Sequence, residues 1–313
     1  MKGMKFCMEN ILIFGHKSPD TDTIMSSLIM EDLEKSFGES STACSLGNIN
    51  KETEYALNYF NVQAPMLIDK VEANTPVILV DHNEFSQSAL GIENAKIIKV
   101  VDHHRINDFK TSEPLFYMAE PVGCTCTILY NLYKINNVTI TPTIAGLMLS
   151  AIISDTLLLK SPTTTIKDKK ALEELSKIAN VDANTYGLDM LKAGTDHSSF
   201  SAKDLINLDA KTVDLNGSKV KVAQVNSVDI NSVLKNQKDI EEEILASIQE
   251  ENLDLFVFAI TDILNSNSEA IVLGKRSDIV ENAYKKKIEN NRVFLPGVVS
   301  RKKQMLPIMQ ENA

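Results

Sequence analysis

The chain has 313 residues, of which 43% are hydrophobic and 24% charged, and its formal net charge is −10. These proportions are typical of a globular protein, and the length allows two domains of ordinary size. An acidic chain lacks the basic face that a nucleic-acid backbone requires, so we expect no nucleic-acid partner. No apolar run approaches the ~20 residues of a membrane span, so we expect no membrane partner.

The cysteines and the start of the chain favour a reducing compartment. The first residues carry positive charge but no long apolar segment, which argues against a secretory signal. Cys7, Cys44, Cys124 and Cys126 have neither zinc-ribbon nor CxxC spacing. Cys124 and Cys126 could bind a metal, but we interpret them as small residues at a helix start. We therefore expect a cytoplasmic protein.

The first half of the chain alternates apolar strands with helices. Strands are predicted at residues 10–15, 76–81 and 96–102. Helices are predicted at residues 23–37, 52–60, 124–134, 142–153 and 167–179, the fourth apolar nearly all round and the last a charged surface helix. Such alternation is typical of parallel strands joined by helical crossovers.

The pattern changes after residue 180. Residues 192–195 are the best candidate for a linker. Beyond them, Asn216-Gly217 predicts a hairpin turn between strands at residues 211–215 and 219–225. A long helix (228–251), two strands (253–260 and 269–274) and a helix (278–288) are predicted next.

The predicted fold class is therefore α/β with two domains. The N-terminal domain (1–191) has a mainly parallel sheet flanked by helices. A hinge (192–197) leads to a smaller α/β domain with a mixed sheet (198–313).

Acidic and histidine side chains gather where apolar elements end. They are His16, Asp20, Asp22, Asp81, His82, Asp102, His103, His104 and Asp155. Parallel strands that end together would bring such side chains to one edge of a sheet, where ligands bind in open α/β folds. Four of the chain's five histidines belong to this set. Imidazole and carboxylate together suit manganese, cobalt, iron or zinc.

Other interpretations stay open for single members of this set. A lone aspartate at a strand end is usually a cap or turn residue. Asp102 could orient a histidine without binding metal, and His82 could be only hydrogen-bonded near the site. We interpret His197 as a surface residue.

A basic segment near the C-terminus carries the complementary charge. Arg301 and Lys302 lie in a short charged run, which is most often an exposed loop. The alternative is an anion clamp, because Arg offers a planar fork to phosphate and Lys a point charge. Lys211 is a weaker candidate for binding phosphate when it is considered by itself.

Five motifs follow one another along the chain. They are Gly-His-Lys-Ser-Pro-Asp-Thr-Asp (15–22), Val-Asp-His-Asn-Glu (80–84), Val-Asp-His-His (101–104), Ser-Asp-Thr (154–156) and Ser-Arg-Lys-Lys-Gln (300–304). Their combination resembles the family II inorganic pyrophosphatases, the manganese-dependent branch of the DHH phosphoesterase superfamily. The Asp-His-His triplet alone would indicate only the superfamily. Ser18 departs from the Asn that family members often have, but it is not a ligand position.

The resemblance implies a DHH domain, a DHHA2-like C-terminal domain and two Mn²⁺ ions per subunit, with Co²⁺ as a substitute. It implies that one ion is bound by His16 and Asp20, the other by Asp22, His103 and Asp155, and that Asp81 bridges both. It also implies catalytic contacts to the substrate from His104, as general acid, and from Lys211, Arg301 and Lys302. The Lys211 assignment rests on the shortest motif.

The implied reaction is hydrolysis of pyrophosphate to two orthophosphates by a metal-bridging hydroxide. Mg²⁺ would arrive with the substrate, the C-terminal basic loop would close over it, and a homodimer is expected. One alternative is another DHH enzyme, such as a nuclease, a cyclic-dinucleotide phosphodiesterase or an exopolyphosphatase. The last hundred residues lack a Gly-Gly-His type motif, which argues against a nuclease or phosphodiesterase. A second alternative is an inactive phosphate or metal sensor, but every expected ligand is present.

Overall fold

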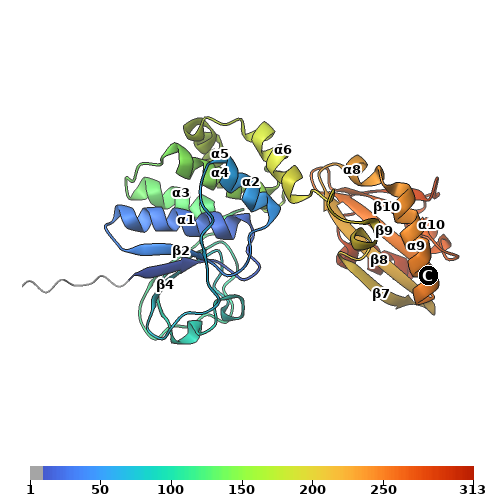
Figure 1. The fold of residues 1–313 in the computed structure, drawn as a ribbon, viewed down its shortest axis with the longest axis horizontal. Coiled ribbons are helices and arrows are strands. Elements are labelled where there is room, and N and C mark those ends of the chain that lie inside the picture. The colour runs from blue at the N-terminus through green and yellow to red at the C-terminus, as the bar shows by residue number, and fades with distance from the viewer. Residues whose placement is uncertain (1–9) are drawn as a thin grey trace, which may run out of the picture. The chain divides into compact units, whose positions relative to one another are not determined.

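The structure is a computed structural model that describes residues 10–313. Cys7 and the charged N-terminal segment lie outside these residues. The chain divides into two compact units, Met1–Gly194 and Thr195–Ala313. Each unit has a sheet of its own, as Figure 1 shows.

The sheet of unit 1 has six strands in the order β3-β2-β1-β4-β5-β6, and all neighbours are parallel. The strands are β1 (Ile11–Phe14), β2 (Ser41–Ser45), β3 (Met66–Leu67), β4 (Pro76–Val80), β5 (Lys96–Asp102) and β6 (Phe116–Ala119). The three strands predicted from apolar runs are β1, β4 and β5, which are adjacent in the sheet. The other three were not predicted, because they are short or rich in small polar residues.

Helices cover the sheet of unit 1, and in Figure 1 the labelled ones lie together above β2 and β4. They are α1 (Thr21–Ser36), α2 (Lys51–Tyr59), α3 (Thr125–Ile135), α4 (Pro142–Thr156), α5 (Ile166–Ala179) and α6 (Ala183–Gly194). The predicted burial of α4 is confirmed, since nearly all of its side chains are buried.

Two helices of unit 1 refine the predictions. The helix α5 is the charged surface helix that was predicted, and it also has a buried face formed by Asp168, Ala171, Leu172 and Leu175. The linker predicted at 192–195 begins inside a helix, because α6 continues to Gly194 and buries Tyr186 among other residues. Both helices have a narrow apolar stripe, and the polar residues between its members hid it in the sequence.

Unit 2 has a mixed sheet in the order β11-β10-β9-β8-β7. Only the pair β8 and β9 is parallel. The strands are β7 (Ala210–Leu215), β8 (Ser218–Ser227), β9 (Leu255–Asp262), β10 (Asn267–Leu273) and β11 (Arg292–Pro296). The predicted α/β architecture, with a mainly parallel sheet followed by a mixed one, is confirmed.

The helices of unit 2 are short except for one. They are α7 (Ala202–Leu205), α8 (Ile230–Leu234), α9 (Gln237–Glu251), α10 (Asp278–Tyr284), a π-helix (Arg301–Met305) and α11 (Leu306–Glu311). The single long helix predicted at 228–251 was wrong, because the chain breaks between α8 and α9. The predicted Asn216-Gly217 turn is confirmed. Both residues have positive φ, as a tight hairpin requires.

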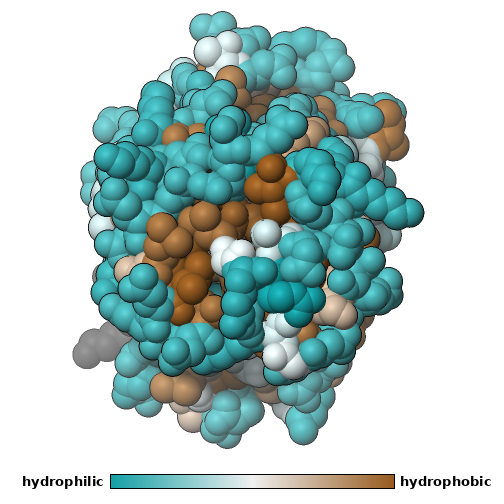
Figure 2. All heavy atoms as spheres, turned by 90° about the vertical axis from the view of Figure 1, so that its right-hand side faces the viewer, coloured by the Kyte–Doolittle hydropathy of each residue, from teal (hydrophilic) through white to brown (hydrophobic). Residues whose placement is uncertain are grey.

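The sheet of unit 2 separates two apolar cores. Along β9, Leu255 and Val257 face one core, whereas Phe256 and Phe258 face the other. This alternation follows from the two-residue period of a strand. Figure 2 looks onto the side that lies at the right of Figure 1 and shows a mainly hydrophilic surface with an apolar area near its centre.

Among residues 10–313, none of the helices is both long enough and apolar enough to cross a bilayer.

Candidate active site

The candidate ligands follow the ends of three neighbouring strands. His16 lies after β1, Asp81 follows β4 and His103 follows β5. Because these strands are parallel and adjacent, their carboxyl ends meet at one edge of the sheet. Asp155 reaches the same place from the last turn of α4.

One group of potential metal ligands consists of His16, Asp20 and Asp81. The Nε2 of His16 lies 3.5 Å from Oδ2 of Asp20 and 3.6 Å from Oδ2 of Asp81. Asp20 is the N-cap of α1, and its side chain accepts a hydrogen bond of 3.0 Å from the amide of Thr23. The helix start thereby holds this carboxylate next to His16.

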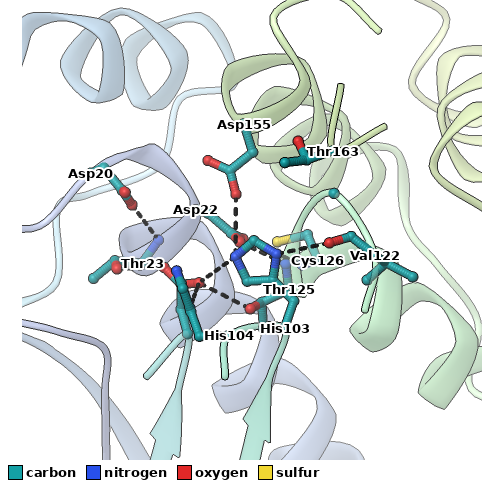
Figure 3. A network of polar contacts seen from close by, with 12 residues as sticks. Asp20, Asp22, Thr23, His103, His104, Val122, Thr125, Cys126, Asp155 and Thr163 are labelled. Atoms are coloured by element: carbon teal, nitrogen blue, oxygen red, sulfur yellow. Dashed lines mark hydrogen bonds and ion pairs between the residues drawn. The ribbon is translucent and has the colours of Figure 1, made fainter. Parts of the chain in front are cut away.

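A second group consists of Asp22, His103 and Asp155. The Nε2 of His103 lies 3.8 Å from Oδ2 of Asp155 and 3.4 Å from Oδ1 of Asp81. Figure 3 shows the carboxylate of Asp155 pointing toward the imidazole of His103. The two oxygens of Asp81 therefore face different groups, Oδ2 toward His16 and Oδ1 toward His103.

The site concentrates negative charge in a buried place. Burial and the charge of Asp22 raise the pKa of Asp81 to about 7. The same two causes raise the pKa of Asp155 well above its usual value. Carboxylates that repel one another in this way favour a cation between them.

The pKa values of the two histidines are raised as well, which favours the charged form of the imidazole. Burial alone would lower the pKa of His16, but its hydrogen bond with Asp20 and the charge of Asp81 raise it to about 9. Burial likewise disfavours the charged form of His103, yet Asp81 and Asp22 raise its pKa to about 10. In the absence of a metal ion, protons on these imidazoles offset part of the negative charge.

Threonines that the sequence analysis missed hold Asp81 in place. The Oγ1 of Thr23 donates to Oδ2 of Asp81 at 2.7 Å, and the Oγ1 of Thr125 donates to Oδ1 at 3.0 Å. Each oxygen of Asp81 thus accepts a hydrogen bond from one threonine and also faces the histidine of one ligand group. No local signal identifies Thr125, because it lies 44 residues from Asp81 in the sequence.

His104 is oriented by Asp102. The backbone N–H and the Nδ1 of His104 lie 3.0 and 2.9 Å from Oδ1 of Asp102. This contact raises the pKa of His104. Burial alone would raise the pKa of Asp102, but the bonds from His104 and Asn83 lower it. The arrangement supports the interpretation of Asp102 as an orienting residue rather than a ligand.

His82 lines a cavity of about 260 Å³ together with His16, Asp81 and His104. Its environment nevertheless differs from that of the other histidines. It is buried, its Nδ1 donates to the carbonyl of Val80 at 2.9 Å, and its Nε2 lies 3.1 Å from Oγ of Ser88. Burial lowers its pKa to about 4, so the ring is neutral. Both ring nitrogens are occupied, which agrees with a hydrogen-bonded neighbour of the site.

Cys124 and Cys126 lie near Asp22, and the three could in principle hold a metal. Both thiols are fully buried, and burial raises the pKa of Cys126 to about 12. A thiol binds metal as the thiolate, which burial disfavours here. Cys124 caps α3 and Cys126 lies in its first turn, in agreement with their interpretation as small helix-start residues.

The basic residues predicted to bind phosphate lie in unit 2. The run 301–305 forms a π-helix rather than the exposed loop that charge runs usually form. The Nη1 of Arg301 lies 2.9 Å from Oδ1 of Asp209, and its buried Nε has no partner among the described residues. Lys302 and Lys211 are exposed, the latter on β7.

Gln224 fastens the start of this π-helix. Its Oε1 accepts a 2.9 Å hydrogen bond from the amide of Arg301, and its Nε2 donates to the carbonyl of Val299 at 2.9 Å. The backbone that carries Arg301 and Lys302 is therefore anchored to β8 by a side chain that the sequence analysis did not single out.

Known proteins resemble this chain over nearly its whole length. Residues 10–152 match the model of the DHH family, N-terminal domain, and residues 188–312 match that of the DHHA2 domain. A "probable manganese-dependent inorganic pyrophosphatase" of an Exiguobacterium species is 54% identical over 307 residues, which cover 98% of this chain and 99% of the relative. The chain belongs to the family II inorganic pyrophosphatases. A Bacillus cereus relative with the same name is 52% identical and covers 97% of this chain and 99% of its own.

Solved structures show the same relationship. The crystal structure of a "putative family II inorganic pyrophosphatase" of Methanococcus jannaschii is 39% identical, with a TM-score of 0.63, and the match covers 96% of this chain and 99% of that chain. An exopolyphosphatase-related protein of Bacteroides fragilis, at 14% identity, has a TM-score of 0.51 over 97% of this chain and 92% of its own. The second likeness concerns the fold alone.

Proposed function

We propose that this protein hydrolyses pyrophosphate to two orthophosphates at a manganese centre in unit 1. The observation that carries the proposal is the position of Asp81, whose two carboxylate oxygens face two separate groups of ligands. Membership of the family supports the same reaction, because the relatives are named for it.

The donor atoms of this chain fit manganese. His16 and Asp20 would hold one ion, Asp22, His103 and Asp155 the other, and Asp81 would contact both. Carboxylates with a minority of imidazoles suit Mn²⁺, and Co²⁺ could replace it. When bound, such ions supply an activated water and neutralise phosphate charge.

His104 is proposed as the general acid and as a contact to the substrate. Its Nδ1 is held by Asp102, which leaves Nε2 for a phosphate oxygen. The same contact raises the pKa of the ring and keeps a proton available for the departing phosphate.

Lys211, Arg301 and Lys302 are proposed to bind the phosphates and to offset the charge on the leaving group. Arg301 is paired with Asp209 in the structure, so a phosphate must compete with that carboxylate. Its buried Nε has no partner among the described residues, so this atom would lose no hydrogen bond if the side chain turned toward an anion. Mg²⁺ entering with the substrate, closure of the basic segment over it, a homodimer and a cytoplasmic location remain predictions.

The deciding experiment is an assay of the purified protein loaded with manganese. We expect phosphate release from pyrophosphate, its loss on chelation, and little action on oligonucleotides, cyclic dinucleotides or long polyphosphate. A metal-loaded protein that does not hydrolyse pyrophosphate would contradict the proposal. Release from long polyphosphate alone would favour the exopolyphosphatase alternative.

A further inference from the structure

One segment, residues 122–127, touches three of the candidate metal ligands. The Nδ1–H of His103 donates to the carbonyl of Val122 at 3.0 Å. The amide of Thr125 donates to Asp22 at 2.6 Å, and its hydroxyl donates to Asp81 at 3.0 Å. Figure 3 shows Val122 and Thr125 beside the imidazole of His103. The position of this segment therefore sets the orientation of ligands from both groups.

Asp168 holds the segment from its other side. The Oδ2 of Asp168 accepts from the amide of Gly123 at 3.0 Å, and its Oδ1 accepts from the hydroxyl of Thr127 at 2.6 Å. Oδ2 also accepts from the amide and the hydroxyl of Thr165, both at 2.7 Å. Asp168 thus joins the start of α5 to the segment, and it lies 41 residues from Thr127 in the sequence.

The packing between Asp168 and the segment is tight. Asp168 is fully buried, and so are Thr125 and Thr127. A Cβ on Gly123 would lie 2.8 Å from Thr156 and 3.0 Å from Oδ2 of Asp168. The segment therefore has little room to move toward α5 while Asp168 is in place.

We propose that Asp168 is a positioning residue for the metal centre. It touches none of the candidate ligands and acts through residues 122–127, whose backbone and hydroxyl groups orient Asp22, Asp81 and His103. Partners outside the ligand set fix the direction of ligand lone pairs, and their loss weakens metal binding. The inference rests on the proposed function for the identity of the ligands.

The competing explanation is that Asp168 only caps α5. It forms a capping box with Thr165, and such a contact stabilises a helix start wherever it occurs. The two explanations differ in which hydroxyl partner of Asp168 matters for metal binding. Thr127 belongs to the segment, whereas Thr165 belongs to the helix cap.

Two matched substitutions separate these explanations. Thr127→Val removes the hydroxyl that donates to Oδ1, and Thr165→Val removes one of the three donors to Oδ2. Each substitution keeps the shape of the side chain. The full chain would be titrated with Mn²⁺ against a fluorescent chelator, with thermal unfolding as a check of folding. We expect Thr127→Val to weaken Mn²⁺ binding by on the order of tenfold, Thr127→Ser to restore it, and Thr165→Val to change it by less than about twofold.

Asp168→Asn supplies an independent test should Thr127→Val fail to fold. The asparagine amide keeps only one acceptor oxygen, so it loses either the bond from Thr127 or the bond from Gly123, and both belong to the segment. Mn²⁺ binding should therefore again weaken by on the order of tenfold. Wild-type affinity in a folded Thr127→Val or Asp168→Asn protein would overturn the proposal, and so would an equal loss in Thr165→Val. If the wild-type protein binds Mn²⁺ but does not hydrolyse pyrophosphate, the proposed function fails while this inference can still be judged from the affinities.

Discussion

Asp81 combines three unusual properties in one residue. It is almost fully buried, its φ of +58° lies in the left-handed region, and its pKa is raised to about 7. Such a backbone conformation is strained for a residue other than glycine and persists where the surroundings hold it. Hydrogen bonds from Thr23 and Thr125 do so here. The strain directs the carboxylate between the two groups of candidate ligands.

Substitution of Asp81 tests whether it contacts both ions. We expect Asp81→Ala to lower the affinity for manganese at both sites by at least about 100-fold, more than loss of an outer partner would. Elemental analysis after dialysis would give the metal content per chain. Two tightly bound ions in the folded variant would show that Asp81 does not bridge them.

Lys302 allows substrate binding to be separated from metal binding. Lys302→Ala should leave the metal content unchanged and raise KM for pyrophosphate by roughly tenfold or more, because a charge-assisted hydrogen bond contributes ~1.5–3 kcal/mol. Steady-state kinetics and elemental analysis would check both parts. The control is Lys238→Ala on α9, where the lysine is 89% exposed. A change in the metal content of Lys302→Ala would contradict the assignment.

The pH dependence of metal binding follows from His16 and His103. In the metal-free protein their pKa values are about 9 and about 10, so both imidazoles carry protons at neutral pH. A ligand imidazole must lose that proton, so metal affinity should rise as the pH rises toward these values.

Titrations between about pH 6 and about pH 9 would measure this dependence. Calorimetry in buffers of different ionisation enthalpy would count the protons released. A manganese affinity that stays constant across this range would contradict the assignment of the two histidines as ligands.

At the scale of elements, the site is built from the starts of two helices, the end of a third and the ends of three strands. The first turn of α1 carries Asp22, and the first amides of α3 donate to the same carboxylate. Helix starts present unpaired N–H groups and favour negative charge. This arrangement allows several carboxylates to approach one another at the sheet edge.

The packing of α4 gives a test of stability at this scale. Gly146 lies against Phe60, and a Cβ at this position would come within 2.2 Å of the ring. Alanine favours a helix over glycine by ~1 kcal/mol, whereas overpacking a core costs ~1–3 kcal/mol. Because the ring has to move, we expect Gly146→Ala to destabilise the metal-free protein by ~1–2 kcal/mol in urea unfolding.

A second substitution checks the cause of this loss. Phe60→Leu provides space beside Gly146, so the double variant should be more stable than the sum of the two single effects. Additive effects would show that Phe60 is not the source of the destabilisation.

At the scale of the whole molecule, each unit has its own sheet and core. All six proposed ligands belong to unit 1, so metal binding should stabilise that unit selectively. A free manganese concentration of about 100 times Kd adds ~2.7 kcal/mol per site to the free energy of unfolding. Hydrogen exchange with and without manganese should show increased protection within unit 1. Equal protection of unit 2 would indicate that stabilisation by the metal extends through the whole chain.

Local patterns predicted the central part of unit 1. The strands β1 and β4 are apolar runs, β5 is one that only Lys99 interrupts, and a candidate ligand follows each. Both signals lie within a few residues, so they can be read directly from the sequence. The short strand β2 lacks such a run, since Ser41–Ser45 is mostly polar, and its place depends on pairing with β1.

The sequence by itself determined the family, the α/β class and the residue types that could hold metal, because motifs and apolar periodicity are local properties. Only the tertiary structure decided which side chains orient those residues. Thr125 reaches Asp81 across 44 positions, and Asp168 reaches Thr127 across 41. Such contacts arise when parallel strands and their crossover helices pack together, and no spacing within the chain encodes them.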